Sequence, residues 1–171
     1  ILDGRNNGGG LDPDIFLNRF KKKVLAYWTR RYSQDQTSPA IVTQAHTVCL
    51  TNLHAGSGGD QFPHDYKEME LGPVIGTRTW GGLVGIWDVP SLIDGGYMTA
   101  PRCGFYDTSG EWAVENEGVA PDVRVEQLPK RVQEGRDPQL EEAVRIALER
   151  LETEGVELLP PPEDPVRVKR P

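Results

Sequence analysis

The chain has 171 residues, a net charge of −7 and a hydrophobic fraction of 37%. That length suffices for one domain with a buried core. The negative charge argues against a nucleic-acid-binding surface, and because no apolar run approaches the roughly 18 residues of a membrane-spanning helix, we expect no membrane span.

Cysteine and histidine usage points to no metal site. Cys49 and Cys103 lie in apolar segments, so both are predicted to be buried free thiols of a protein in a reducing compartment. The three histidines, His46, His54 and His64, show no ligand spacing. We therefore expect neither a metal nor a cofactor.

The first predicted elements are the end of a strand at residues 1–3 and a helix that begins at Asp12. The glycines at residues 8–10 between them allow a tight loop whose amides can approach a ligand closely. Asp12 is the expected N-cap, and the apolar residues Ile15, Phe16, Leu17 and Phe20 predict a buried face. Since the strand lacks its usual beginning, we expect the chain to be the C-terminal part of a longer polypeptide.

The middle of the chain reads as strands at residues 24–28, 47–51 and 74–76, with an exposed polar loop at 30–39 and a helix at 61–69. Strand-like residues at 83–86, 97–99 and 104–106, with a hairpin turn at 107–110, predict a meander. A short strand from Trp112 follows, and Val123 and Val125 alternate with charged residues as in a half-buried strand.

The clearest predicted helix opens at Asp137 and Pro138. One stripe of it holds Leu140, Val144, Ala147 and Leu151, which are predicted to be buried. Residues 156–171 are rich in proline and are expected to form an extended tail. Alternating helices and strands predict an α/β or α+β domain.

Ser57 stands at the predicted junction between a strand and a helix, among small residues that leave its hydroxyl uncovered. The amides after it lie at a helix N-terminus, where negative charge is favoured. A nucleophile needs such preorganised N–H donors beside it. The local sequence leaves one alternative open, since serine is also a preferred N-cap.

Four segments in order, residues 3–10, 51–60, 71–82 and 114–122, resemble motifs of the tricorn-type branch of the C-terminal-processing serine peptidases. Residues 137–141 match the closing helix of that family. The resemblance implies an α/β (α+β) fold with a ClpP/crotonase-like sheet and helices packed on it, incomplete at the N-terminus. It also implies that residues 1–155 are the C-terminal part of a serine peptidase catalytic domain.

The resemblance implies roles for individual residues. Ser57 matches the nucleophile, and the amides of Gly58 and Gly10 match the two oxyanion donors. Glu115 matches an acid that orients the catalytic histidine through an intervening serine. From the residues alone, Glu115 reads instead as an ordinary turn carboxylate beside Asn116 and Glu117, because surface acids are mostly solvated.

A serine hydroxyl also needs a base within hydrogen-bonding distance. In the processing-peptidase branch the base is a lysine after a Thr-aromatic-Gly turn, and the matching residue here is Gly82, which cannot accept a proton. His54 lies three residues before Ser57 on the same loop and would have to fold back. We therefore expect a histidine, together with its serine partner, from outside this chain.

Arg78 and Trp80 are predicted to support the site, with packing and a surface salt bridge as the alternative. Residues 27–39 are the expected source of the choice of substrate side chain, with no single specificity residue identified in them. The resemblance further implies peptide substrates, upstream domains in the same polypeptide, a homo-oligomer and a cytoplasmic location.

Together these inferences predict a serine endopeptidase domain that cleaves peptides or unfolded proteins by acyl transfer through Ser57. The alternative is a non-catalytic ligand- or peptide-binding domain on the same fold, because one fold can carry unrelated functions. No nucleic acid or membrane is expected as a partner.

Overall fold

The computed structural model describes residues 1–10, 13–87, 89–155, 160–163, 166 and 168. The predicted N-cap at Asp12 and most of the predicted tail at 156–171 lie outside these residues.

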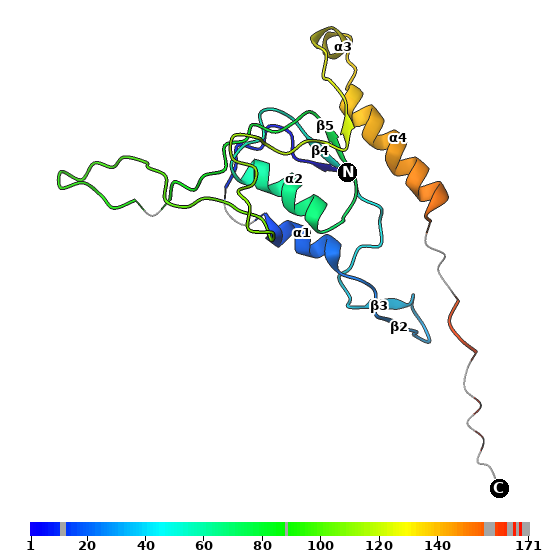
Figure 1. Ribbon diagram of the computed structural model, residues 1–171. Coiled ribbons are helices and arrows are strands. Elements are labelled where there is room, and N and C mark those ends of the chain that lie inside the picture. Colours follow the sequence, from blue (N-terminus) through cyan, green and yellow to red (C-terminus); the bar gives the residue numbers. More distant parts are fainter. Residues whose placement is uncertain (11–12, 88, 156–159, 164–165, 167, 169–171) are drawn as a thin grey trace.

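A parallel sheet forms the centre of the molecule (Figure 1). Its four strands, in spatial order, are β1 (Leu2–Asp3), β4 (Cys49–Thr51), β5 (Val74–Gly76) and β6 (Val123–Arg124). The two central strands are buried along their whole length, as expected for parallel strands covered on both faces. Since all four strands run the same way, the loops that follow them meet at one edge of the sheet.

Helices cover both faces of this sheet. On one face α1 (Asp14–Lys21) and α2 (Gly58–Glu68) pack through Leu17 and Tyr66 onto Cys49. On the other face α4 (Pro138–Thr153) packs through Ala143 onto Leu50. Cys49 and Leu50 are neighbours in β4, so they point to opposite faces. The predicted α/β fold, a sheet with helices packed on it, is confirmed.

The buried faces of α1 and α4 differ from the predictions. In α1 only Leu17 is buried, while Ile15 and Phe16 are 66% and 67% exposed. In α4 the fully buried residues are Gln139 and Ala143, and Leu140, Val144 and Leu151 of the predicted stripe are exposed. The small Ala143 lets α4 approach the sheet closely, and Gln139 Nε2 donates to Val125 O (2.9 Å), which fixes the rotation of the helix.

Two predicted loop and strand assignments also change. The predicted polar loop at 30–39 contains β3 (Gln36–Ser38), which pairs antiparallel with β2 (Ala26–Trp28). The sequence of β3 shows no alternation of apolar and polar residues, so the strand could not be recognised from it. A short helix, α3 (Pro129–Gln133), was not predicted either.

The predicted meander is an arm, described at residues 83–87 and 89–112, whose outer part projects from the body of the molecule (Figure 1). Its base stays in the body, because Leu83 and Phe105 pack with Val114 and Val119. Among its described residues only two isolated bridges form, Gly85–Cys103 and Tyr106–Trp112, so the three predicted strands are wrong. Cys103 lies on this arm and is exposed, contrary to prediction. Cys49 is buried as predicted, and desolvation raises the pKa of its thiol to about 12.

In the part of the chain that the structure describes, no helix has the length and apolar character needed to cross a membrane. Nor do three or more His, Cys, Asp or Glu side chains gather there in an arrangement able to hold a metal ion.

Candidate active site

Ser57 occupies the turn between β4 and α2. Its backbone angles, φ 56° and ψ −122°, lie in a region that residues with a side chain rarely adopt. Although it stands at the N-cap position of α2, its side chain makes no capping hydrogen bond. Ser57 is therefore the N-cap residue of α2 by position, as that alternative expects, but its side chain caps no backbone amide. Backbone strain of this kind persists only where the surroundings hold it, at a cost of about 1–3 kcal/mol.

The neighbouring loop, residues 79–82, holds the strained turn. Ser57 N donates to Gly82 O (3.0 Å), and Trp80 N donates to Ala55 O (2.9 Å). The Trp80 indole packs directly on Gly56, where a Cβ atom would lie only 2.6 Å from the ring. Trp80 thus supports the Ser57 turn by packing, and it does not line the pocket described below.

Asp60 is a buried carboxylate that the sequence analysis missed. Its Oδ1 accepts from Gly81 N (2.8 Å) and its Oδ2 from Gly82 N (3.1 Å), so the charge is paired with two amides. An acid three residues after a helix-starting serine usually accepts from that serine's own N–H, as in a capping box. Here Ser57 N donates to Gly82 O instead. Asp60 therefore holds the loop that carries this acceptor, by binding the amides of Gly81 and Gly82.

The glycine loop after β1 approaches Ser57 closely. A Cβ atom on Gly9 would lie 2.6 Å from Ser57 Cβ, and a Cβ atom on Gly58 would lie 2.9 Å from Gly10 N. Within the described residues, neither Gly10 N nor Gly58 N donates a hydrogen bond. The structure therefore brings together Ser57 and the two amides that the resemblance assigns to the oxyanion.

A pair of glycine variants tests this close approach. Gly9→Ala is expected to displace the loop from Ser57, because φ at Gly9 is +103° and the added methyl would overlap the Ser57 side chain. We expect a loss of about 1–3 kcal/mol in the free energy of unfolding, measured by denaturant titration. Gly8→Ala is the matched control, since nothing lies within 4 Å of its added Cβ. Equal effects of both variants would contradict the packing described here.

Glu115 is anchored at the base of the arm. Its Oε2 accepts from Leu83 N (2.6 Å) and from Val84 N (2.7 Å). Glu115 lies in a turn, as the alternative expects, but its carboxylate binds two amides and is not left to solvent alone. Arg78 Nη1 donates to the carbonyls of Glu117 (3.0 Å) and Gly118 (3.2 Å), which steadies the loop that follows Glu115.

A pocket of about 160 Å³ opens at Ser57. Gly10, Ser57 and Gly58 line it together with side chains of the arm, among them Leu83, Cys103 and Phe105. No histidine lines it. His54 borders a different, polar pocket, His64 packs edge-on against Phe105 with ring centroids 5.0 Å apart, and His46 contacts Glu154.

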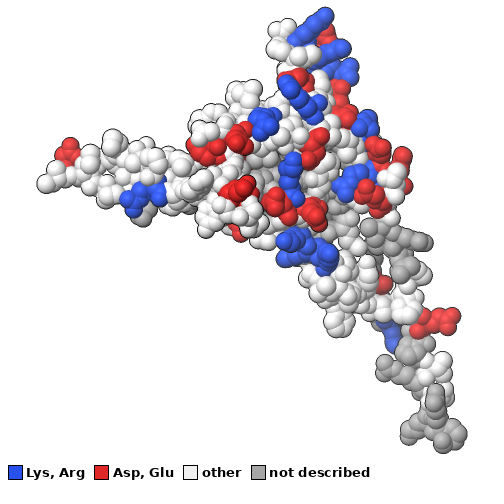
Figure 2. Space-filling view, in the orientation of Figure 1, with Lys and Arg blue, Asp and Glu red and all other residues white. Residues whose placement is uncertain are grey.

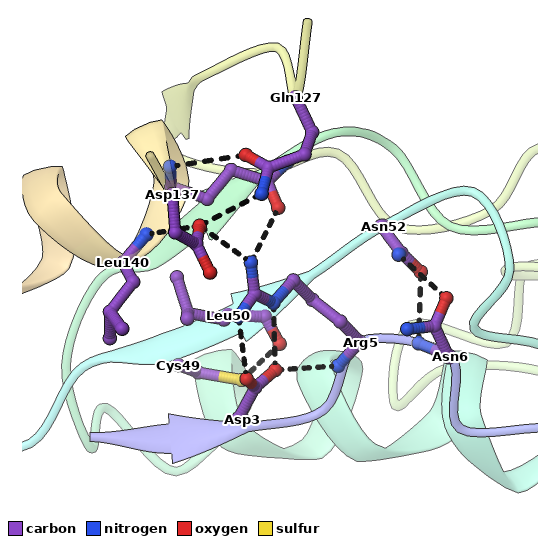
Figure 3. A network of polar contacts seen from close by, with 10 residues as sticks. Asp3, Arg5, Asn6, Cys49, Leu50, Asn52, Gln127, Asp137 and Leu140 are labelled. Atoms are coloured by element: carbon purple, nitrogen blue, oxygen red, sulfur yellow. Dashed lines mark hydrogen bonds and ion pairs between the residues drawn. The ribbon is translucent and has the colours of Figure 1, made fainter. Parts of the chain in front are cut away.

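An arginine network ties the glycine loop to α4 (Figure 3). Arg5 Nη2 donates to Asp3 Oδ2 (2.7 Å) and Arg5 Nη1 donates to Asp137 Oδ1 (2.9 Å). The same Asp137 oxygen accepts from Leu140 N (3.0 Å) and so caps α4. Beside this network, Asn6 N donates to Asn52 Oδ1 (3.0 Å) and Asn52 Nδ2 donates to Asn6 Oδ1 (3.0 Å), which links the glycine loop to the segment that precedes Ser57.

This network predicts a specific acid sensitivity. The pKa of Asp137 is lowered from 3.8 to about 2, chiefly because its carboxylate accepts a hydrogen bond from Arg5. A lowered native pKa stabilises the fold above pH 3.8, and that contribution is lost as the pH falls towards 2. We expect the free energy of unfolding of wild type to exceed that of Asp137→Asn by a margin that is about 1 kcal/mol larger at pH 6 than at pH 2, after allowance for solvent screening. Urea unfolding at both pH values measures this, and a gap independent of pH would contradict it.

Residues 1–125 of the chain match the sequence model of peptidase family S41. The tricorn protease of Thermoplasma volcanium is 39% identical over 158 residues, which is 92% of this chain and 15% of that protein. Tricorn protease homolog 1 of Streptomyces coelicolor is 36% identical over 89% of this chain and 14% of its own length.

Solved structures of peptidases share the fold of this chain. The crystal structure of the tricorn protease superposes with a TM-score of 0.82 at 37% identity, over 88% of this chain and 15% of that one. The photosystem II D1 C-terminal processing protease matches in fold alone, with a TM-score of 0.54 at 23% identity over 85% of this chain and 38% of that one. The chain spans about 15% of the length of the tricorn proteases that it matches. A family match over residues 1–125 places the chain in peptidase family S41.

Proposed function

We propose that this chain is the nucleophile-bearing part of a serine peptidase catalytic domain, which cleaves peptides or unfolded proteins by acyl transfer. Membership of a peptidase family and the similarity to tricorn proteases support a peptidase. The observation that carries the proposal for Ser57 is its strained, uncapped position at the mouth of a pocket, beside two amides that donate to no other described residue.

In the proposed reaction, Ser57 Oγ attacks the carbonyl carbon of the substrate peptide. The negative oxygen that forms is stabilised by the N–H groups of Gly58 and Gly10, which are held in place before the reaction begins. The base takes the proton from Oγ and then gives it to the leaving amine. A water molecule next releases the acyl group from Ser57 by the same steps in reverse order.

We assign the base to a histidine outside this chain, with Glu115 acting on it through a serine hydroxyl. Glu115 is suited to this role because its Oε2 is occupied by two amides, while its Oε1 accepts no hydrogen bond from the residues that the structure describes. That oxygen is available to a donor from an upstream segment. A carboxylate so anchored orients its partner without moving itself.

The alternative is a non-catalytic binding domain on the same fold. A binding domain has no use for a strained serine whose hydroxyl caps nothing, so the geometry at Ser57 favours the enzyme. Upstream domains in the same polypeptide, assembly into a homo-oligomer and a cytoplasmic location remain predictions from the resemblance.

The assignment of the base predicts how activity depends on chain length. We expect the 171-residue chain alone to show no turnover of a fluorogenic peptide, and a longer polypeptide that includes the upstream segment to show turnover that Ser57→Ala abolishes. Fluorescence release measures both. Hydrolysis by the isolated chain that depends on Ser57 would refute the outside base, and its loss in His54→Ala would move the role to His54.

A further inference from the structure

Charge contributes little to the surroundings of Ser57. Among the described residues that line the pocket there, none carries a charge. The arm beside it also shows few charged groups in the space-filling view (Figure 2). In the proposed reaction, the described part of this chain therefore stabilises the negative oxygen through the N–H groups of Gly10 and Gly58. Such hydrogen bonds weaken steeply when their distance or angle changes, so the placement of these two amides decides the rate.

The two donor amides lie on different loops, and asparagine side chains join these loops at their beginnings (Figure 3). Asn52, directly after β4, exchanges two hydrogen bonds with Asn6 of the glycine loop. Its Oδ1 also accepts from His54 N (3.1 Å) on its own loop. Asn6 faces it in a left-handed backbone conformation (φ 59°), which asparagine tolerates better than most residues. One side chain, that of Asn52, thus fixes the start of both loops.

A second connection runs through Asn7. Its carbonyl oxygen accepts from Gly56 N (2.9 Å), on the residue just before the proposed nucleophile, and its side-chain Oδ1 accepts from Gly9 N (3.0 Å). The contact is close, because a Cβ atom on Gly59 would lie 2.0 Å from Asn7 O. Gly9 N–H is therefore occupied, while Gly10 N–H donates to no described residue. Asn7 thus determines which amide of the glycine loop is left for a substrate oxygen.

We propose that Asn52 and Asn7 are positioning residues of this site, which hold the glycine loop and the turn after β4 in the arrangement that lets both donor amides meet one oxygen. The proposal rests on the proposed function, because it takes Ser57 as the reacting group. Neither asparagine lines the described pocket at Ser57, and an amide side chain exchanges no proton. Both act on the reaction only through the donors that they fix.

Removal of either side chain should slow the chemical step without weakening substrate binding. In the longer polypeptide, Asn52→Ala and Asn7→Ala are each expected to lower kcat by a factor of about ten or more, with KM changed by less than about threefold. The pH dependence of kcat should stay as in wild type. Hydrolysis of a fluorogenic peptide measures all three quantities. A loss confined to KM, or a kcat within about threefold of wild type in either variant, would overturn the proposal.

A peptide aldehyde with the sequence of that substrate tests the oxyanion directly. Ser57 Oγ adds to the aldehyde carbon as the carbonyl double bond opens, the Oγ proton passes to the base, and the aldehyde oxygen carries the negative charge between the two amides. We expect its inhibition constant to rise in both variants by the factor by which kcat/KM falls. The matching peptide alcohol, which forms no such oxyanion, should bind as to wild type. Equal weakening of both inhibitors would overturn the proposal.

Two further variants separate positioning from stability. Tyr66→Phe removes a buried hydrogen bond to Thr47 Oγ1 (2.9 Å) before β4, so it should lower the unfolding midpoint and leave kcat unchanged. Asn52→Asp keeps an acceptor for the amides of Asn6 and His54, so its kcat should stay within about threefold of wild type. A loss of kcat in Tyr66→Phe equal to that in Asn52→Ala would overturn the proposal.

The remaining outcomes distinguish this proposal from the proposed function. Asn7→Ala keeps the backbone hydrogen bonds of Asn7, so it carries the test if Asn52→Ala does not fold. Wild-type turnover that depends on Ser57 but is unchanged by loss of the asparagine side chains would refute the positioning role and leave the peptidase standing. A wild-type polypeptide that neither cleaves peptides nor binds the aldehyde would refute the peptidase and the positioning role with it.

Discussion

Ser57→Ala is expected to lower kcat of the longer, active polypeptide by a factor on the order of 10⁴ to 10⁶. In the proposed reaction the substitution removes the one atom that forms the acyl bond, and the remaining amides and pocket supply only a small residual rate. KM should change little, because substrate contacts in the pocket remain. Hydrolysis of a fluorogenic peptide measures both constants.

The fold should tolerate this substitution. The Ser57 side chain makes no capping hydrogen bond, so its loss removes no contact that stabilises α2. We expect the unfolding midpoint of Ser57→Ala to stay close to wild type. Ser109→Ala is the matched control for activity, because Ser109 lies in an exposed turn against Asp107 and away from the pocket. A Ser57→Ala variant that keeps activity within tenfold of wild type would contradict the assignment.

Asp60→Ala is expected to destabilise the chain by about 3 kcal/mol. The change leaves the amides of Gly81 and Gly82 without their acceptor, and Gly81 is buried. Asp60→Asn should cost less, because its one carbonyl oxygen can still accept from one amide. Glu68→Ala, an exposed acid on the same helix, should change stability by less than about 0.5 kcal/mol. Chemical denaturation of the chain gives these values.

Asp60 also matters for the reactivity of Ser57 in this account. Gly82 supplies the carbonyl that accepts from Ser57 N, so loosening the Gly81–Gly82 segment releases the strained turn. We expect Asp60→Asn to lower kcat at least tenfold with a smaller change in KM and an unchanged pH profile, since Asp60 positions the turn and exchanges no proton. A shifted pH profile would instead place Asp60 in the proton transfer.

The parts of the fold predicted correctly are those governed by local sequence. The buried strands β4 and β5 are short apolar runs between turn residues, and the helix from Asp137 carries its own cap, so nothing distant is needed to recognise them. Small residues around Ser57 likewise marked its turn directly.

The parts predicted wrongly depend on distant partners. Leu140 and its neighbours form the more apolar stripe of α4, yet the helix turns Ala143 to the sheet because Arg5 pairs with Asp137 and Gln139 reaches Val125. Cys103 lies in an apolar segment but is exposed, although Phe105 two residues later packs on the buried cluster of Leu83, Val114 and Val119. The signal for Asp60 was its place in the first helical turn, but its acceptor role depends on amides that lie 21 and 22 residues further along the chain.

The proposed roles of Glu115 and Gly10 rest on the family resemblance, because no local pattern links a turn acid or a loop glycine to a serine far away in sequence. The structure adds the reason why these residues suit the site: Glu115 fixes the start of the arm, and Gly10 lies against Gly58.

The central claim is that the hydroxyl of Ser57 is an activated nucleophile. The most direct measurement treats the longer polypeptide with a peptidyl diphenyl phosphonate, digests it and maps the adduct by mass spectrometry. We predict a single adduct, on Ser57, and none in Ser57→Ala. Unmodified Ser57, under conditions in which a known serine peptidase is fully labelled, would contradict the account.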